Sequence, residues 1–413
     1  MKNNYNIGIY GISGSGKSTL TKHLCDESSK LKYFEGSKIM ENILNDDISK
    51  FKFLNDIQKY KIREEVISII KKESAIDKHN IIDGHYSFIK EHDIFEIAIT
   101  KSDIEFFTHI FYLDIKDEII RKQQVDDKSK KRDFSIEQIK KWKEFEKIEL
   151  QQLCKNNNIN FHILTTNNLN SNINYIQEII NKENLLNDLK QYTNNNINKY
   201  ILFDADNTIV NFDTGKDYMY KTLNIDIKNV KSCFKDGGYC FSSFLKLSKI
   251  HSKIDNSSFI NAMKNIAFKI EIEDEFLDLM QMYNKKYNIC IVTAGFTVLW
   301  QEVLKKYNLK NIKIFGGNNL NIDDYIIDNN LKGLIANYLQ SNNKYVISFG
   351  DSLLDKDMLI NSNKGYFIIR NKIRNDVISK LCKHNHIKYL SIHSLNTDEL
   401  EETNFNKIRE ELN

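Results

Sequence analysis

The sequence of 413 residues contains no proline, where average usage of about 5% would give roughly 20. Turns must therefore be built by Asn, Asp and Gly, which tolerate left-handed backbone. Asn-rich stretches such as 156–158 and 194–196 are accordingly expected to be loops. An AT-rich genome, whose codons favour Asn, Lys and Ile over proline, accounts for this composition without any function.

Long apolar runs and cysteine motifs are also missing. No stretch approaches the roughly 18 apolar residues that a membrane-spanning helix needs. The N-terminus leads directly into an apolar strand and lacks the apolar core of a signal peptide. The six cysteines form no C-x-x-C pair and no cluster with histidine. We therefore expect a reduced, cytoplasmic protein with no structural zinc and no membrane partner.

Charge of either sign is not in excess. The 59 Lys and Arg residues oppose 56 Asp and Glu residues, and the first 195 positions contain 30 of each sign. A dedicated nucleic-acid binder usually carries a basic excess, so composition argues against that class. With 41% hydrophobic and 28% charged residues, the chain is expected to form two or three globular domains.

Apolar strand-like runs alternate with helical patterns twice over, which predicts an α/β protein of two three-layer domains, each built on a parallel sheet. Strands are expected at 5–10, 33–34, 79–83, 109–113 and 160–164, and then at 200–203, 288–293, 313–315, 345–349 and 365–369. The predicted domains are 1–191 and 200–400, joined by an Asn-rich connector at 192–199. The tail from residue 397 is expected to be charged, helical and solvated, and residues 401–413 are placed outside the second domain.

A phosphate-binding motif follows the first predicted strand. The run from Gly11 to Ser18 reads GISGSGKS, which fits G-x-x-x-x-G-K-[ST] and opens a helical pattern. Backbone N–H groups of such a loop wrap phosphates, Lys17 reaches the outer phosphates, and the Ser18 hydroxyl suits Mg²⁺. The predicted ATP and Mg²⁺ contacts are Gly11, Ser13, Gly14, Ser15, Gly16, Lys17, Ser18 and Thr19.

Phosphoryl transfer also needs a carboxylate near the acceptor and basic residues over the phosphates. Asp83 ends a predicted strand on the ligand side of the sheet, where it could hold Mg²⁺ or accept the substrate proton. Glu35, after the short second strand, is the alternative base. Arg121 and Arg132 lie in a charged run and are the predicted lid residues. This half of the chain resembles kinases of the adenylate/polynucleotide kinase type.

The second half carries four motifs in order, three of them at the ends of predicted strands. Their residues are Asp204 and Asp206 in a D-x-D-x-T pattern, then Thr293, Lys332, and the acids Asp351 and Asp355. This series resembles the haloacid-dehalogenase-like (HAD) phosphatases. Asn207 stands where glycine is commoner in the first motif, and asparagine tolerates the left-handed backbone that such a position requires.

The resemblance implies an aspartyl-phosphate mechanism in which Asp204 is the nucleophile and Asp206 the general acid and base. It also implies that Thr293 and Lys332 bind the phosphoryl oxygens, with Lys313 as the alternative lysine. The implied Mg²⁺ ligands are Asp204, Asp206, Asp351 and Asp355.

The 84 residues between Thr208 and Thr293 are too many for a single helix that connects two strands. Apolar residues at helical spacing in this segment predict a helical cap at about 212–286. This resembles the cap of phosphoserine-phosphatase-like members.

In motif order the chain is similar to phage-type polynucleotide kinase–phosphatases and to fusions of a kinase with a HAD domain. Three functions stay open. They are a bifunctional kinase and phosphatase of small metabolites such as nucleosides or nucleotides, a nucleic-acid end-healing enzyme, and a phosphatase regulated by ATP binding.

Overall fold

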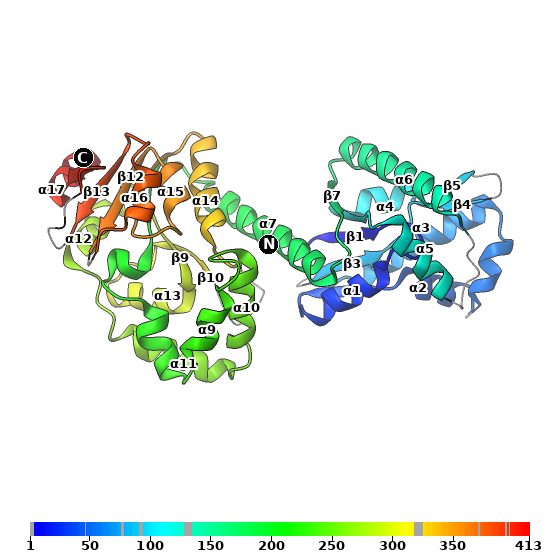
Figure 1. Cartoon of the computed structure of the whole chain (residues 1–413), viewed down its shortest axis with the longest axis horizontal. Helices are drawn as coiled ribbons and strands as arrows, with labels where there is room; N and C mark the ends of the chain where they lie inside the picture. The colour runs from blue at the N-terminus through cyan, green and yellow to red at the C-terminus, as the bar shows by residue number, and fades with distance from the viewer. Residues whose placement is uncertain are drawn as a thin grey trace. The chain divides into compact units, whose positions relative to one another are not determined.

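The computed structural model describes residues 4–45, 47–75, 78–90, 94–127, 134–317, 325–370, 372–392, 395 and 397–413. The chain divides into two compact units, Met1–Ile179 and Ile180–Asn413, each with a parallel main sheet (Figure 1). The division falls inside helix α7 (Leu169–Tyr192), ahead of the connector where we placed the boundary. The reason is that Leu185 and Leu189 of α7 are buried in the core of the second unit.

The first unit contains a five-stranded parallel sheet in the order β2-β3-β1-β6-β7, and all five predicted strands are present. Its strands are β1 (Asn6–Tyr10), β2 (Leu31–Phe34), β3 (His79–Asp83), β6 (His109–Leu113) and β7 (Asn160–Leu164). An antiparallel hairpin of β4 (Ser87–Ile89) and β5 (Phe95–Ile97) was not predicted. The helices are α1 (Lys17–Asp26), α2 (Gly36–Ile43), α3 (Asp56–Glu73), α4 (Lys101–Phe106), α5 (Asp117–Asp126) and α6 (Ile136–Asn156).

The central strands of this sheet are covered on both faces. Ile7 and Ile9 of β1 and Ile110 and Phe111 of β6 are completely buried, which is why these strands are continuous apolar runs in the sequence. Parallel strands end at a common edge of the sheet, so the loop after β1 lies beside the end of β3. Ile9 pairs directly with Asp83 in the register.

The second unit contains a seven-stranded parallel sheet in the order β10-β9-β8-β11-β12-β13-β14. The strands are β8 (Lys199–Phe203), β9 (Asn288–Phe296), β10 (Lys313–Gly317), β11 (Tyr345–Gly350), β12 (Lys364–Ile369), β13 (Ile387–Ser391) and β14 (Glu401–Thr403). The helices are α8 (Tyr220–Thr222), α9 (Ile227–Cys233), α10 (Phe241–His251), α11 (Asn256–Ala267), α12 (Asp274–Tyr283), α13 (Thr297–Lys306), α14 (Asn329–Ser341), α15 (Lys356–Ile360), α16 (Asn375–Leu381) and α17 (Phe405–Leu412).

Strand β8 lies between β9 and β11, and this order positions the candidate site. Phe203 at the end of β8 pairs with Ile291 on one side and with Phe349 on the other. The residues that follow these three strands therefore meet at one edge of the sheet. Helices α8 to α11 belong to the segment between β8 and β9, where the cap was predicted, and α12 returns the chain to the core.

The C-terminal segment corrects one expectation. Residues 401–413 are not a solvated tail, because β14 pairs with β13 and α17 buries Ile408 and Leu412 in the same core as α12. The two apolar residues are spaced i, i+4 among charged ones, so they form the buried stripe of an amphipathic helix. The charged composition of the segment concealed this stripe.

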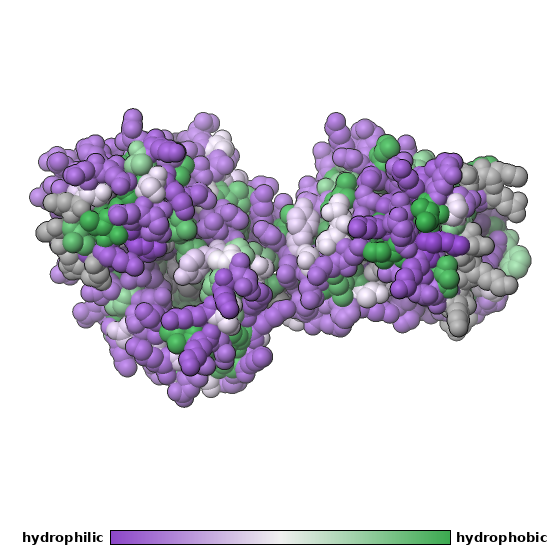
Figure 2. Space-filling model, in the orientation of Figure 1, coloured by the Kyte–Doolittle hydropathy of each residue, from purple (hydrophilic) through white to green (hydrophobic). Residues whose placement is uncertain are grey.

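None of the helices in the described ranges has the length and apolar character needed to cross a bilayer. The face drawn in Figure 2 agrees with this, since hydrophilic residues dominate it and the hydrophobic areas are small and scattered.

If α17 is an integral part of the second unit, Ile408→Ala should lower the free energy of unfolding of that unit by about 2–4 kcal/mol, because it empties a buried apolar site. Denaturant unfolding monitored by circular dichroism measures the change. The matched control is Lys407→Ala, which truncates an exposed side chain of the same helix and should change stability by no more than about 0.5 kcal/mol. Equal stability of the two variants would contradict the packing described here.

Candidate active sites

Asp204 lies at the carboxyl end of β8 and is buried. Its backbone N–H donates to Phe349 O of the neighbouring strand at 2.9 Å, so its position is fixed by the sheet. The following turn depends on Asn207, whose φ of 56° lies in the left-handed region that asparagine tolerates. Thr208 Oγ1 donates back to Asp204 Oδ2 at 3.4 Å.

Lys332, in the first turn of α14, is the cation of the site and is only 1% exposed. Its Nζ donates to Asp204 Oδ1 at 2.5 Å and to Asp355 Oδ1 at 2.6 Å. Burial lowers the pKa of Lys332, but the two carboxylates outweigh this effect and hold the pKa above its usual range. Lys332 is therefore charged. Lys313, the alternative lysine, instead pairs with Asp188 at 2.7 Å.

Asp355 connects Lys332 to the loop after β11. While Oδ1 accepts from Lys332, Oδ2 accepts from Asp351 N at 3.2 Å, from Ser352 N at 3.0 Å and from Ser352 Oγ at 2.7 Å. A Cβ on Gly350 would lie 2.4 Å from the Cβ of Asp355. The glycine in this motif is therefore a steric requirement of the turn that holds Asp351.

Asp204, Asp351 and Asp355 form the one cluster in the described part of the chain whose carboxylate oxygens all lie within 4.8 Å of one another. Burial and the neighbouring Asp355 carboxylate raise the pKa of Asp204 to about 7, and burial, Asp355 and Asp204 raise that of Asp351. Three carboxylates face one lysine here. A divalent cation would neutralise the excess negative charge, and an all-oxygen donor set suits Mg²⁺.

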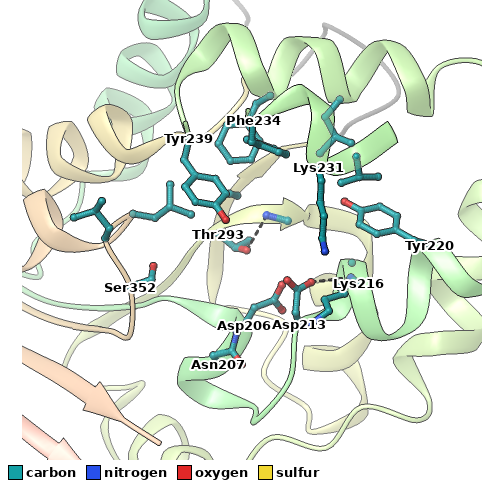
Figure 3. Close-up of a pocket in the computed structure, with 18 of the residues that line it drawn as sticks. Asp206, Asn207, Asp213, Lys216, Tyr220, Lys231, Phe234, Tyr239, Thr293 and Ser352 are labelled. Carbon is teal, nitrogen blue, oxygen red and sulfur yellow. Dashed lines mark hydrogen bonds between the residues drawn. The ribbon is translucent and has the colours of Figure 1, made fainter. Parts of the chain in front are cut away.

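Asp206, also expected among the metal ligands, does not belong to this cluster. Its Oδ2 accepts from Thr214 Oγ1 at 3.0 Å, and its buried Oδ1 has no partner among the described residues. Burial, together with Asp213 and Asp204, raises its pKa well above the usual range. Asp206 lies on the cavity wall, as Figure 3 shows, so its environment suits a carboxyl group that carries a proton.

Thr293, Asp204, Asp206 and Asp351 border a single cavity of about 780 Å³. Thr293 is buried on β9, and its Oγ1 accepts from Gly295 N at 2.9 Å (Figure 3). The opposite wall comes from α9 and α10 of the predicted cap and from the loop between them, including Lys231 and Tyr239. The cavity therefore lies between the motif residues at the sheet edge and the helical segment.

Arg370, which was not predicted as a site residue, binds the backbone of the turn that follows Asp204. Its side chain is 5% exposed and donates to Asn207 O at 2.7 Å, to Thr208 O at 2.5 Å and to both oxygens of Glu273. Arg370 belongs to none of the sequence motifs. Its acceptors in the turn are backbone carbonyl groups, which every residue has, so the sequence gives no sign of the contact.

The first unit contains the predicted phosphate-binding loop between β1 and α1. Gly11, Gly14 and Gly16 have φ values of 148°, 87° and 90°, which other L-residues rarely adopt. Lys17 is buried, and its Nζ donates to Gly11 O at 2.7 Å. The buried Ser15 Oγ has no partner in the described residues. This fits a loop that wraps phosphate oxygens.

Helix α5 packs on this loop, which the sequence did not indicate. Gln124 Nε2 donates to Ser13 O at 2.7 Å, and a Cβ on Gly14 would approach the Gln124 side chain at 2.7 Å. Arg121, half-buried, lies three residues before Gln124 and so shares its face of the helix. Arg132, the second predicted lid residue, lies outside the described residues.

Asp83 meets the phosphate-binding loop at the end of β3. Its Oδ2 accepts from Ser18 Oγ at 2.5 Å and its Oδ1 from Tyr33 OH at 2.8 Å. Glu35 instead pairs with the nearby Lys38 at 3.2 Å. Thr19, the last residue predicted to contact ATP, is exposed in the first turn of α1.

Residues 10–141 match a sequence family described as an AAA domain, whereas no curated protein sequence matches the chain.

Several solved structures are similar in fold. A phospho-aspartyl intermediate analogue of phosphoserine phosphatase is 16% identical, covers 52% of this chain and 100% of its own, and gives a TM-score of 0.36. A shikimate kinase from Acinetobacter baumannii is 16% identical, covers 43% of this chain and 94% of its own, and gives a TM-score of 0.33. With the sheet orders and motif positions above, the first unit has a P-loop kinase fold and the second a HAD-like fold.

Proposed function

We propose that the second unit is a Mg²⁺-dependent phosphatase of small phosphorylated metabolites, with nucleotides as the favoured class. The observation that carries this proposal is the position of Asp204, which is buried at a strand end, held by Lys332 and open to the cavity. An anionic nucleophile fixed beside a cation and a cluster of carboxylates matches the needs of phosphoryl transfer.

In this proposal, an oxygen of Asp204 attacks phosphorus and the bond from phosphorus to the leaving oxygen breaks. Asp206 donates its proton to that oxygen, and its raised pKa supports this role. Water then hydrolyses the aspartyl-phosphate and returns a proton to Asp206. Lys332 and Thr293 stabilise charge on the phosphoryl oxygens. Mg²⁺ held by Asp204, Asp351 and Asp355 would offset the repulsion between nucleophile and phosphate.

We further propose that the first unit transfers a phosphoryl group from ATP. The hydrogen bond from Ser18 to Asp83 supports a shared role of the two residues in holding Mg²⁺, with Lys17 on the phosphates. Glu35, beyond the end of β2, is then the carboxylate that remains for the acceptor hydroxyl. If this unit only senses ATP, no γ-phosphate will reach any acceptor.

A paired screen tests both proposals. Phosphate release and transfer of ³²P from ATP are measured across nucleosides, nucleotides, sugars, 5′-hydroxyl oligonucleotides and 3′-phosphorylated oligonucleotides. Small substrates should be preferred, because a cavity under helices encloses a small molecule better than a polymer end. A preference of about tenfold or more for the oligonucleotides, falling steeply with salt, would support end healing instead.

Asp204→Asn should lower phosphatase kcat by several orders of magnitude, since the amide keeps the shape of the side chain but is a poor nucleophile. ATP binding should be unchanged. Phosphatase kcat and ATP affinity are measured on the same preparation of the variant. The reciprocal control is Lys17→Ala, which should impair ATP-dependent transfer and spare phosphate release. Retention of more than a few per cent of wild-type phosphatase activity by Asp204→Asn would exclude Asp204 as the nucleophile.

Removal of divalent cations should abolish phosphate release reversibly, because three mutually repelling carboxylates meet at the nucleophile. Activity is assayed after EDTA treatment, and then with Mg²⁺ or Ca²⁺ restored. Recovery is expected with Mg²⁺. An EDTA-resistant activity would contradict the proposed role of the cluster.

Arg370→Met should lower phosphatase kcat by roughly tenfold to a hundredfold, since a small displacement of the motif that carries Asp206 disturbs alignment. KM should change less than kcat, because Arg370 contacts the motif and not the substrate. The control is Arg409→Met, which removes an arginine that pairs with Asp278 at 3.6 Å and should leave kcat unchanged. Unchanged kcat in a folded Arg370→Met protein would rule out the positioning role.

A further inference from the structure

Four lysines line the cavity, and we name them the cap lysines: Lys216, Lys228, Lys231 and Lys235. They come from the segment between β8 and α10 and are exposed at the surface of the cavity. Figure 3 shows the side chain of Lys231 extending into the cavity toward Asp206 and Asp213. Lys216 approaches the same region from the other side.

The cap lysines differ from Lys332 and Arg370, the two buried cations near Asp204, in lacking ion pairs. Lys332 is shared by two carboxylates and Arg370 is paired with Glu273. Across the described residues, no side chain of a cap lysine forms an ion pair or hydrogen bond. Asp213 lies near them, yet its Oδ1 accepts from the backbone N–H of Lys216 at 2.8 Å. None of the four ammonium groups is therefore held by a carboxylate, although Asp206 and Asp213 line the same cavity.

An aromatic surface accompanies the cap lysines. The rings of Phe234 and Tyr239 lie 5.0 Å apart, and both residues line the cavity. Figure 3 shows them beside Lys231. The cavity thus combines the acids around Asp204, an apolar ring surface, and ammonium groups that form no ion pair.

We propose that the cap lysines bind a second phosphate, so that the preferred substrate of the phosphatase is a small bisphosphorylated molecule with a planar ring, of the nucleoside bisphosphate class. This rests on the proposed phosphatase function and specifies its substrate. One phosphate reacts at Asp204, while the other accepts charge-assisted hydrogen bonds from the cap lysines. The ammonium groups of the cap lysines repel each other, and a bound phosphate dianion would offset that repulsion.

The size of the cavity agrees with such a substrate. A volume of about 780 Å³ lies within the roughly 300–1,000 Å³ typical of sites for small ligands. Several lysines match the charge of a phosphate better than that of a single carboxylate. A 3′-phosphorylated oligonucleotide presents the same chemistry through its phosphodiesters, and a substrate comparison distinguishes the two sources.

The test compares kcat/KM for a nucleoside 3′,5′-bisphosphate, the matching 5′-monophosphate and a 3′-phosphorylated oligonucleotide. Wild type should prefer the bisphosphate over the monophosphate by about tenfold or more. The double variant Lys231→Gln/Lys235→Gln should lose that preference. The matched control, Lys221→Gln, replaces an exposed lysine of α8 that does not line the cavity, and it should retain the preference. Equal kcat/KM values for bisphosphate and monophosphate in wild type would overturn the proposal, as would an oligonucleotide favoured tenfold over the bisphosphate.

A binding measurement separates this proposal from the phosphatase function itself. Affinities of the bisphosphate and the monophosphate are measured by calorimetry on Asp204→Asn, with and without the two lysine substitutions, at two salt concentrations. Tighter binding of the bisphosphate that weakens with salt and disappears in the lysine variant supports the subsite. Equal affinities overturn it. If wild type releases phosphate from no compound, the proposed function fails, and this binding comparison still decides the subsite.

Discussion

The second unit depends on one interaction, the buried ammonium group of Lys332 between the carboxylates of Asp204 and Asp355. Burying charges costs free energy, and the cost is offset only where each charge finds a well-placed partner. Asp328 caps α14 through Leu331 N and so fixes the turn that carries Lys332. Asp355 extends the same constraint to the loop after β11. One ion triad thereby sets the relative positions of three motifs that are far apart in sequence.

The charge of the cavity changes from one end to the other, and each end has its own physical role. Near Asp204 one lysine faces three carboxylates, so this end has an excess of negative charge that a divalent cation would offset. At Lys231 the charge is unpaired, so it can attract an anion and orient it. If the proposed function holds, this arrangement separates the residues that react with the phosphate from the residues that select the substrate.

The sequence predicted the features that leave a local pattern. The main strands were identified because parallel strands covered on both faces are continuous apolar runs, as in 79–83 and 345–349. Three of the four motifs of the second unit could be located because they follow such strands. The short β14 was missed because two of its three residues are exposed. Arg370 was missed because it acts on carbonyls more than 160 residues away. The cap lysines were missed because lysines on a helix resemble a solvated face until the cavity is seen.

Lys17 of the first unit and Lys332 of the second differ in the groups to which they donate hydrogen bonds, and this difference determines how easily each can change partners. Both occupy the first turn of a helix at the carboxyl edge of a parallel sheet. Lys17 donates to neutral backbone oxygens of its own loop, and such contacts can be exchanged for phosphate oxygens at little cost. Lys332 faces two buried carboxylates, and moving it would leave both charges unpaired. Lys17 is thus suited to exchange its partners when a nucleotide binds, whereas Lys332 fixes the position of Asp204, the proposed nucleophile.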